Sequence, residues 1–472
     1  MSKNLPFQTL LILCFALGVI SGHKTGLNHL IIAEIILVAG GLILLMLKKQ
    51  KLVIGWALSF ALGSFYLNLH SYLAPKQFLP GCQSAQISSQ IKESATYSEF
   101  LVSAKTGEAA VIRTKILGNY GYADKIELCA TEQNLTKETS RADYFLAKYK
   151  TTNLIYNPDI KLLSEGKGFV RAVFNFSQKI ADAAKELFAG DTAVLAKGLI
   201  IGSSSGFSDR FKDNLQGSGT SHIVAVSGYN VSIITVIIFQ LIRNLFSRRS
   251  AIISSILFLA GFCLLSGFTP SVTRASFMGG VYILSKIIGR KGTAINSLFV
   301  AGLVMLLVNP YTLWDISFEL SFAATAGLAF SDEIMGFIKK KVLFATLLTI
   351  LAETLVAQIF TLPIILLYFG RVSLVAPLAN ILILPIIPLA MLFVSLAIAA
   401  FFVLKPLGII IGGLTSVILN YVMLVINGLG SLRWSSYGFD KIHWGWTIAA
   451  YILLIAVSII IREKIRSKRL QH

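Results

Sequence analysis

Apolar runs about as long as a membrane-spanning helix recur along most of the chain. Three of them open it, over roughly 5–21, 29–47 and 52–69. A helix needs about 20 such residues to cross the hydrocarbon core of a bilayer. Nine further runs follow, at about 222–242, 250–268, 274–289, 294–309, 316–330, 342–368, 374–404, 407–428 and 446–461. The pattern predicts a polytopic α-helical membrane protein with about twelve spans.

The span expected at 374–404 differs from the others because it carries Pro377, Pro385 and Pro388. Proline interrupts helical hydrogen bonding, and irregular backbone at membrane depth is tolerated only inside protein or beside water. We therefore expect this span to be broken or re-entrant.

A stretch of different pattern, residues 72–172, separates the third span from the rest. β-branched and polar residues alternate in Ala110–Leu117 and again in Asp124–Cys129, with a Gly118–Gly121 turn between them. Alternation with a period of two is typical of half-buried strands. The stretch also holds 13 Lys+Arg and 10 Asp+Glu, nearly half of the 23 acids in the chain. It predicts a small water-soluble all-β domain, a barrel or a sandwich, inserted after the third span.

Residues 173–220 show a third pattern, in which charged side chains such as Asp182 and Lys185 interrupt apolar positions. Ser208 is placed to cap a short helix that begins at Asp209. Amphipathic helices on the membrane surface or plugging the bundle explain the pattern, and so do ordinary connecting helices. The domain organisation that follows is three transmembrane helices (1–71), a β domain (72–172), amphipathic helices (173–220), a transmembrane bundle (221–461) and a basic tail (462–472).

Composition agrees with a membrane protein, because 55% of residues are hydrophobic and only 14% are charged. Soluble domains carry about 25% charged residues. The composition excludes intrinsic disorder, a coiled coil, a collagen and a disulfide-dense mini-protein. The net charge of +19 does not by itself indicate nucleic-acid binding, since positively charged cytoplasmic loops also produce it.

The basic residues predict the topology. With twelve spans, 17 of the 42 Lys and Arg residues fall in loops or tails on one side, which should be the cytoplasm. Both chain ends are then cytoplasmic and the β domain is extracytoplasmic. The 17 residues are Lys48, Lys49, Lys51, Arg243, Arg248, Arg249, Arg290, Lys291, Lys339, Lys340, Lys341, Lys405, Arg462, Lys464, Arg466, Lys468 and Arg469.

Two of the four cysteines, Cys82 and Cys129, lie in the exported domain 47 residues apart. In an oxidising compartment they are a candidate disulfide. The chain has no Walker A sequence, no H-E-x-x-H and no Cys-x-x-Cys. No metal site, cofactor or ATP-driven motor is therefore expected in this chain.

Polar residues are concentrated where the bundle begins. His222, Ser227 and Asn230 enter a segment that should otherwise suit lipid. Ser227 and Asn230 share one helix face, which is suited to line a polar route, and Ser227-Gly228 allows close helix packing. Packing by small residues with satisfied hydrogen bonds explains the segment equally well.

Ionisable residues within spans are functional candidates by default. Arg274 stands at the head of one expected span, and Glu319 lies within another. Each residue is expected either to line a polar route through the membrane or to hold two helices together. Gly202–Gly206 also matches G-x-S-x-G, but a nucleophile elbow needs a strand before it and a helix after it. A Gly/Ser turn between amphipathic helices explains that match better.

Between Gly198 and Pro385 short motifs follow one another in a defined order. They are Gly198, Gly202–Gly206, Gly219–His222, Ala225–Gly228, Pro270–Ala275, Gly289-Arg290, Asn309-Pro310, Ser317–Ala323, Pro363, Phe369-Gly370, Pro377, Asn380 and Pro385. In this order they resemble the ComEC family, the membrane channels for DNA uptake in bacterial competence. The β domain, around Tyr120–Asp124, is similar to the family's extracytoplasmic OB-like region.

The resemblance implies a channel that passes single-stranded DNA across the inner membrane during natural transformation. Ser221, His222, Ser227, Gly228, Asn230, Arg274, Glu319 and Asn380 are the channel or gating candidates. Asn230 stands where the family often has His, and Glu319 where it often has Gln. OB-like surfaces hold single strands through basic tracks and aromatic side chains. The DNA-binding candidates are Arg113, Lys115, Lys125, Lys148, Lys150, Tyr120 and Tyr122, although a solvated surface and a β core would account for them too.

Many family members carry a C-terminal metallo-β-lactamase-like domain, proposed as the nuclease. This sequence contains no H-x-H-x-D-H-like run, so no enzymatic activity is expected of it. The partners implied are single-stranded DNA, the lipid bilayer, a separate DNA receptor, a nuclease, and a cytoplasmic motor or single-strand-binding protein.

Two rival functions remain open at this point. A small-solute or lipid transporter would use the broken span 374–404 as its binding site, but would require an inverted repeat that the sequence does not display. An intramembrane serine hydrolase would pair Ser227 with His222. Five residues separate them, so their side chains would diverge by about 140° on one ideal helix.

Overall fold

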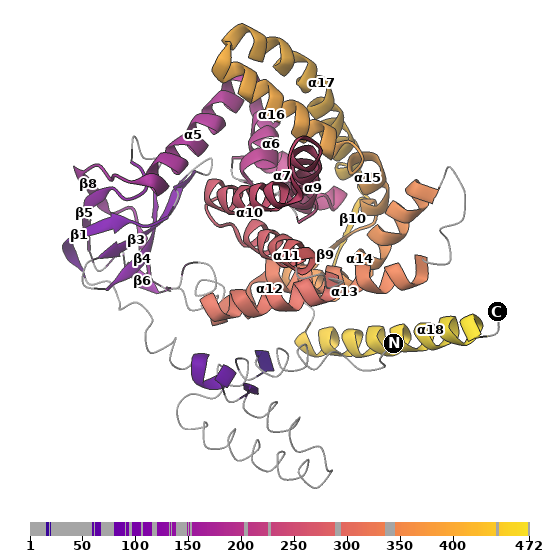
Figure 1. Ribbon diagram of the computed structural model, residues 1–472. Helices are drawn as coiled ribbons and strands as arrows, with labels where there is room; N and C mark the ends of the chain where they lie inside the picture. Colours follow the sequence, from indigo (N-terminus) through magenta and orange to yellow (C-terminus); the bar gives the residue numbers. More distant parts are fainter. Residues whose placement is uncertain are drawn as a thin grey trace.

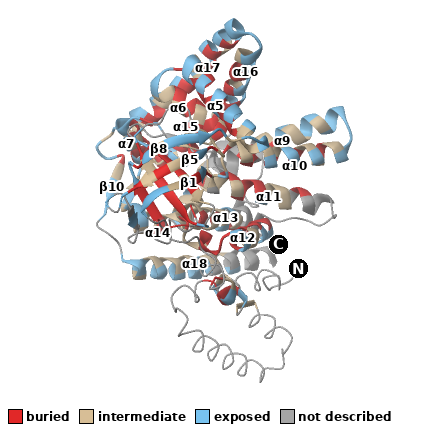
Figure 2. Cartoon of the chain, turned by 90° about the vertical axis from the view of Figure 1, so that its left-hand side faces the viewer, coloured by how far each residue is buried: buried red, intermediate tan, exposed pale blue. Residues whose placement is uncertain are grey.

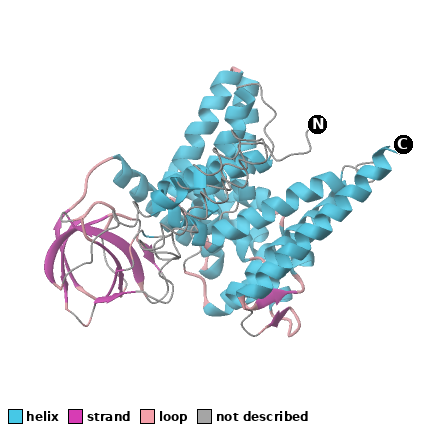
Figure 3. Cartoon of the chain, turned by 90° about the horizontal axis from the view of Figure 1, so that it is seen from below, coloured by secondary structure: helices cyan, strands magenta, loops and turns pink. Residues whose placement is uncertain are grey.

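The computed structural model describes most of the chain after residue 80. The described residues are 16–17, 19, 59–60, 62–67, 80–89, 91–93, 97–104, 107–115, 120–131, 133, 135–137, 149, 151, 153–202, 206–224, 228–287, 294–335, 345–439 and 443–470. The three helices expected over 1–71 lie almost entirely outside this set. Within it, most of the strands form one part of the molecule, and the helices with one short pair of strands form the other (Figures 1 and 3).

The strands form the predicted β domain. They are β1 (Gly81–Ile87), β2 (Lys92–Glu93), β3 (Ser98–Ala104), β4 (Ala109–Thr114), β5 (Lys125–Ala130), β6 (Leu135–Lys137), β7 (Asn153–Tyr156) and β8 (Asp159–Ser164). The order along the sheet is β6-β7-β4-β3-β1-β5-β8, with β2 beside β3. All pairs are antiparallel except β4 with β7. A separate β domain is therefore confirmed, whereas its OB-like topology stays a prediction.

The alternating pattern explains how the strands build a core. Phe100, Ile112 and Leu128 have side chains with almost no exposure, and they pack in one cluster inside the curved sheet. Cys82 and Cys129 lie directly opposite each other on β1 and β5 and are joined by a disulfide. The bond therefore links two neighbouring strands whose intervening chain includes β2, β3 and β4.

The helices follow in chain order. They are α5 (Phe169–Leu187), α6 (Gly190–Ile201), α7 (Asp209–Ser218), α8 (Ser221–Val224), α9 (Gly228–Leu245), α10 (Arg248–Leu265), α11 (Pro270–Ile287), α12 (Ala294–Val308), the 3-10 helix η2 (Pro310–Trp314), α13 (Ile316–Met335), α14 (Ala345–Phe369), α15 (Ala376–Ile383), α16 (Ile387–Val403), α17 (Lys405–Gly430) and α18 (Trp444–Leu470). Most begin and end within a few residues of the spans expected from hydropathy. The span expected at 222–242 is divided between α8 and α9.

The expected break in 374–404 is present. α15 and α16 form a pair bent by 49°. Pro385 lies in the three-residue connection between them, where it cannot continue the helical hydrogen bonding. Two short strands, β9 (Arg371–Ser373) and β10 (Ser436–Gly438), pair antiparallel just after α14 and α17.

The largest buried cluster joins α5, α6, α7, α15, α16 and α17. Leu195, Phe211, Ile383, Val394 and Leu419 contribute to it from five of these helices. The opposite face of α17 is apolar yet open, because Leu414, Val417 and Leu424 are each more than 60% exposed (Figure 2). A large exposed apolar face is unusual for a soluble protein and suits contact with lipid.

Within the described residues, α10, α17 and the Leu351–Phe369 part of α14 are long and apolar enough to cross a membrane, and the bent α15–α16 pair adds a fourth candidate. The expected total of about twelve spans stays a prediction.

Candidate functional site: a glycine-rich junction of the bundle

The motif Gly217–His222 lies at a sharp turn between α7 and α8. Ser208 caps α7 as expected, and its side-chain oxygen accepts a hydrogen bond from the backbone N–H of Phe211 at 3.3 Å. Gly219 ends the helix in the left-handed conformation with φ of 70°, which favours glycine. The hydroxyls of Ser218 and Thr220 are fully buried and lie 2.7 Å apart.

Two other segments press against this turn, and only glycine leaves room for them. A Cβ atom on Gly217 would lie 2.6 Å from the carbonyl oxygen of Gly430 at the end of α17. A Cβ atom on Gly219 would lie 2.6 Å from that of Ala376 at the start of α15. A Cβ atom on Gly430 would lie 2.2 Å from the carbonyl oxygen of Asn214. We call this contact of α7, α15 and α17 the glycine junction.

Polar side chains join the same segments. The Ser373 hydroxyl on β9 donates to the carbonyl oxygen of Gly217 at 2.7 Å. The Asn214 side-chain amide donates to the side-chain oxygen of Asn427 on α17 at 2.8 Å. The Gln358 amide on α14 donates to the carbonyl oxygen of Ser373 at 3.1 Å. The junction is thus packed closely and hydrogen-bonded at once.

The predicted channel residues lie at and beyond this junction. Ser221 and His222 are exposed on α8, directly after the buried turn. Asn380, one turn of α15 after Ala376, is buried, and its side-chain oxygen has no hydrogen-bond partner among the described residues. Gly228 begins α9. Ser227 and the side chain of Asn230 lie outside what the structure describes.

Arg274 and Glu319 belong to a second group, at the heads of α11 and α13. Arg274 is 7% exposed, and its Nη1 atom has no hydrogen-bond partner within the described part of the chain. Asp315, which is also buried, attracts it electrostatically. Asp315 also caps α13 by accepting the backbone N–H of Phe318 at 3.1 Å. The Tyr368 hydroxyl on α14 donates to Glu319 at 3.1 Å.

The DNA-binding candidates of the β domain have different surroundings. Arg113 donates to the Glu99 carboxylate at 2.7 Å, and Tyr149 also bonds that carboxylate. Burial alone would lower the pKa of the Arg113 guanidinium, but the hydrogen bond and charge of Glu99 outweigh burial and raise this pKa. Lys115 and Lys125 are exposed, whereas Lys148 and Lys150 lie outside the described residues.

Tyr120 and Tyr122 have contacts inside the protein. The Tyr120 hydroxyl donates to the carbonyl oxygen of Ile160 at 3.2 Å, and its ring packs on the sheet core. The Tyr122 ring meets that of Phe174 on α5 edge to face, with centroids 4.9 Å apart. Neither ring is placed as an open stacking platform.

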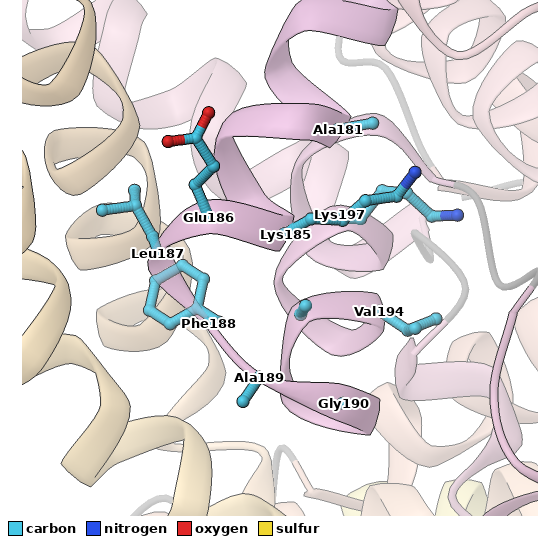
Figure 4. Close-up of a pocket in the computed structure, with 10 residues that line it drawn as sticks. Ala181, Lys185, Glu186, Leu187, Phe188, Ala189, Gly190, Val194 and Lys197 are labelled. Atoms are coloured by element: carbon cyan, nitrogen blue, oxygen red, sulfur yellow. The ribbon is translucent and has the colours of Figure 1, made fainter.

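A cavity of about 400 Å³ lies at the turn from α5 into α6. Lys185 and Lys197 extend to one side of it, and Glu186 extends to the other (Figure 4). Glu186 is paired there with the Lys405 ammonium at 2.5 Å. None of the channel or DNA-binding candidates lines this cavity.

A known family profile, described as "Competence protein", matches residues 199–464, which is more than half of the chain. The chain belongs to the competence-protein family. It is also 30% identical over 227 residues to ComE operon protein 3 of Bacillus subtilis (strain 168). Those residues make up 48% of this chain but only 29% of the relative, so the match spans less than a third of that protein. No solved structure matches the chain.

The competence-family match runs from the end of α6 into α18, so it includes both the glycine junction and the Arg274 group. It confirms the resemblance drawn from the ordered motifs. The family profile and the apolar helices together indicate a membrane protein.

Three residues that hold these groups together were not among the sequence candidates. Asp315 had a local signal, since an acidic residue directly before an apolar helical run is a typical N-cap. Asn214 and Ser373 had none, because their partners lie far away in the sequence.

Proposed function

We propose that this chain forms a channel that passes single-stranded DNA across the bacterial inner membrane into the cytoplasm during competence. The observation that carries the proposal is the family match, which covers the bundle from the end of α6 into α18. The β domain is then extracytoplasmic and both termini are cytoplasmic. The disulfide between Cys82 and Cys129 supports this side for the β domain, because disulfides persist in oxidising compartments.

We propose that the DNA strand passes along the polar residues near the glycine junction. Ser221 and His222 are exposed beside a closely packed turn, so their backbone is held while their side chains stay available. Transport needs weak, repeated contacts rather than tight binding, because a strand held too firmly cannot leave. Hydroxyl and imidazole groups suit such contacts. Arg274 and Glu319 are better suited to hold α11, α13 and α14 in place than to touch the strand.

Deletion of the gene should abolish transformation while binding of DNA to the cell surface continues. The measurement is recovery of a marker, together with uptake of labelled DNA into the cytoplasm. Complementation with the full gene provides the control. Normal cytoplasmic uptake in the deletion strain would contradict the proposed function.

The β domain gives a second prediction at residue level. Lys115→Gln and Lys125→Gln should each weaken binding of a single-stranded oligonucleotide. Each should also reduce the slope of the logarithm of the binding constant against the logarithm of the salt concentration by about 0.7, the value for one lost phosphate contact. Binding is measured for the full chain in nanodiscs over a series of salt concentrations. Lys179→Gln, an exposed lysine on α5, is the matched control. An unchanged slope in both test variants would remove these lysines from the interface.

A further inference from the structure

α5 connects the β domain to the far end of the α16–α17 hairpin (Figure 1). At its first turn, Arg171 forms an ion pair with Asp124 of the β domain. The Arg171 side chain is 15% exposed and that of Asp124 is fully buried. A buried carboxylate needs several partners, because its desolvation is costly.

Asp124 has those partners. One carboxylate oxygen accepts the backbone N–H of Gly121 at 2.6 Å, and the other accepts that of Gly166 at 2.7 Å. Arg171 extends the arrangement by donating to the carbonyl oxygen of Tyr122 at 3.3 Å. One carboxylate therefore ties the 121–124 loop, the linker before α5, and α5 itself.

Packing reinforces this joint. A Cβ atom on Gly166 would lie 2.4 Å from the carbonyl carbon of Ala123, so the linker rests directly on the loop. The Tyr122 ring meets Phe174 one turn further along α5. The angle between the β domain and α5 is fixed by polar and apolar contacts together.

The remainder of α5 is fastened to the bundle. The Ser177 hydroxyl donates to the carbonyl oxygen of Leu265 at the end of α10, at 3.1 Å. Glu186 pairs with Lys405 at the start of α17. A Cβ atom on Gly412 of α17 would lie 3.2 Å from Leu187. Beyond its first turns, α5 is thus held by both α10 and α17.

We propose that α5 acts as a strut and that Arg171 is a positioning residue, which holds the β domain at a fixed place relative to the bundle. A strand bound on the domain would then be presented to the bundle in one orientation. Only the identity of the cargo rests on the proposed function. The joint itself does not depend on it.

The chemistry suggests variants that separate the joint from the fold. Arg171→Met leaves Asp124 with both backbone N–H groups, so the β domain should stay folded while the link to α5 loosens. Arg171→Lys keeps the positive charge but lacks the planar guanidinium that reaches both the Asp124 carboxylate and the Tyr122 carbonyl oxygen. Its effect should therefore lie between those of the parent chain and Arg171→Met. Lys179→Met, two turns along α5 and exposed, is the control for removing a positive charge.

The experiment measures the distance between the two parts in the full chain. Spin labels are placed at Lys161→Cys in β8 and Val417→Cys in α17, with Cys14 and Cys263 replaced by serine and the Cys82–Cys129 disulfide kept. The expected result is a narrow distance distribution for the parent chain and for Lys179→Met, and a broad one for Arg171→Met. Transformation should fall by about tenfold in Arg171→Met, within the range found for residues that couple two sites. Oligonucleotide binding should not change.

A narrow, unshifted distance distribution in Arg171→Met would show that Arg171 does not hold the β domain in place, whether or not the cell takes up DNA. A broad distribution with undiminished transformation would overturn the role of the strut in delivery. If the parent chain supports no DNA uptake, the proposed function fails, and the distances still decide the joint. Should Arg171→Met not be recovered folded, Tyr122→Leu loosens the same joint through the Phe174 contact and is judged by the same distances.

Discussion

Gly430→Ala is expected to lower the free energy of unfolding by about 3 kcal/mol, the upper part of the range for overpacking. The new Cβ atom would lie 2.2 Å from the carbonyl oxygen of Asn214, which is backbone and cannot rotate away. α17 and α7 would have to separate, and the Asn214–Asn427 hydrogen bond would be lost with them. The measurement is denaturant unfolding of the detergent-solubilised chain.

Gly428→Ala supplies a matched control in the same helix. A Cβ atom on Gly428 meets nothing within 4 Å. Because alanine is the better helix former, this variant should be more stable than the parent by about 0.5–1 kcal/mol. Equal stability of the two variants would show that the close approach at Gly430 does not limit the fold.

Asp315→Asn should remove the negative charge that faces the buried Arg274 guanidinium and lower the free energy of unfolding by roughly 3 kcal/mol, the lower part of the range for a buried charge that loses its partner. Asparagine still caps a helix, so the bond to the Phe318 N–H should persist and the charge alone is tested. Adding Arg274→Met removes the buried cation as well. The double variant should therefore recover much of the loss.

The same unfolding measurement decides this prediction. If the double variant is destabilised by the sum of the effects of Asp315→Asn and Arg274→Met, Arg274 and Asp315 do not interact. Arg274 would then be better explained as a residue that lines the route of the DNA strand.

Local sequence signals predicted the elements well where one segment determines its own structure. The expected spans at 294–309 and 407–428 correspond to α12 and α17, and the prolines located the break between α15 and α16. Alternation in 110–117 and 124–129 located β4 and β5. Helical and strand periodicity depend on residues only a few positions apart, so a single sequence displays them.

Contacts between distant segments could not be predicted in this way. The sequence predicts close packing at Ser227-Gly228, but it does not reveal that α17 and α15 approach Gly217 and Gly219. The pattern places Arg171 in the β domain, because the amphipathic segment is expected to begin at residue 173, and so it does not reveal the role of Arg171 at the joint. Tyr120 and Tyr122 are predicted to contact DNA, yet both side chains have partners inside the protein, because periodicity does not reveal which side of a loop faces the next domain.

The pairing of β9 with β10 has a mechanical consequence for the bundle. These short strands bind the turn after α14 to the turn after α17, and Ser373 of β9 holds the end of α7 as well. Parting any one of the three segments from the others would break the strand pairing or the Ser373 bond. We therefore expect these three segments to move together, so that any opening of the protein hinges around them rather than through them.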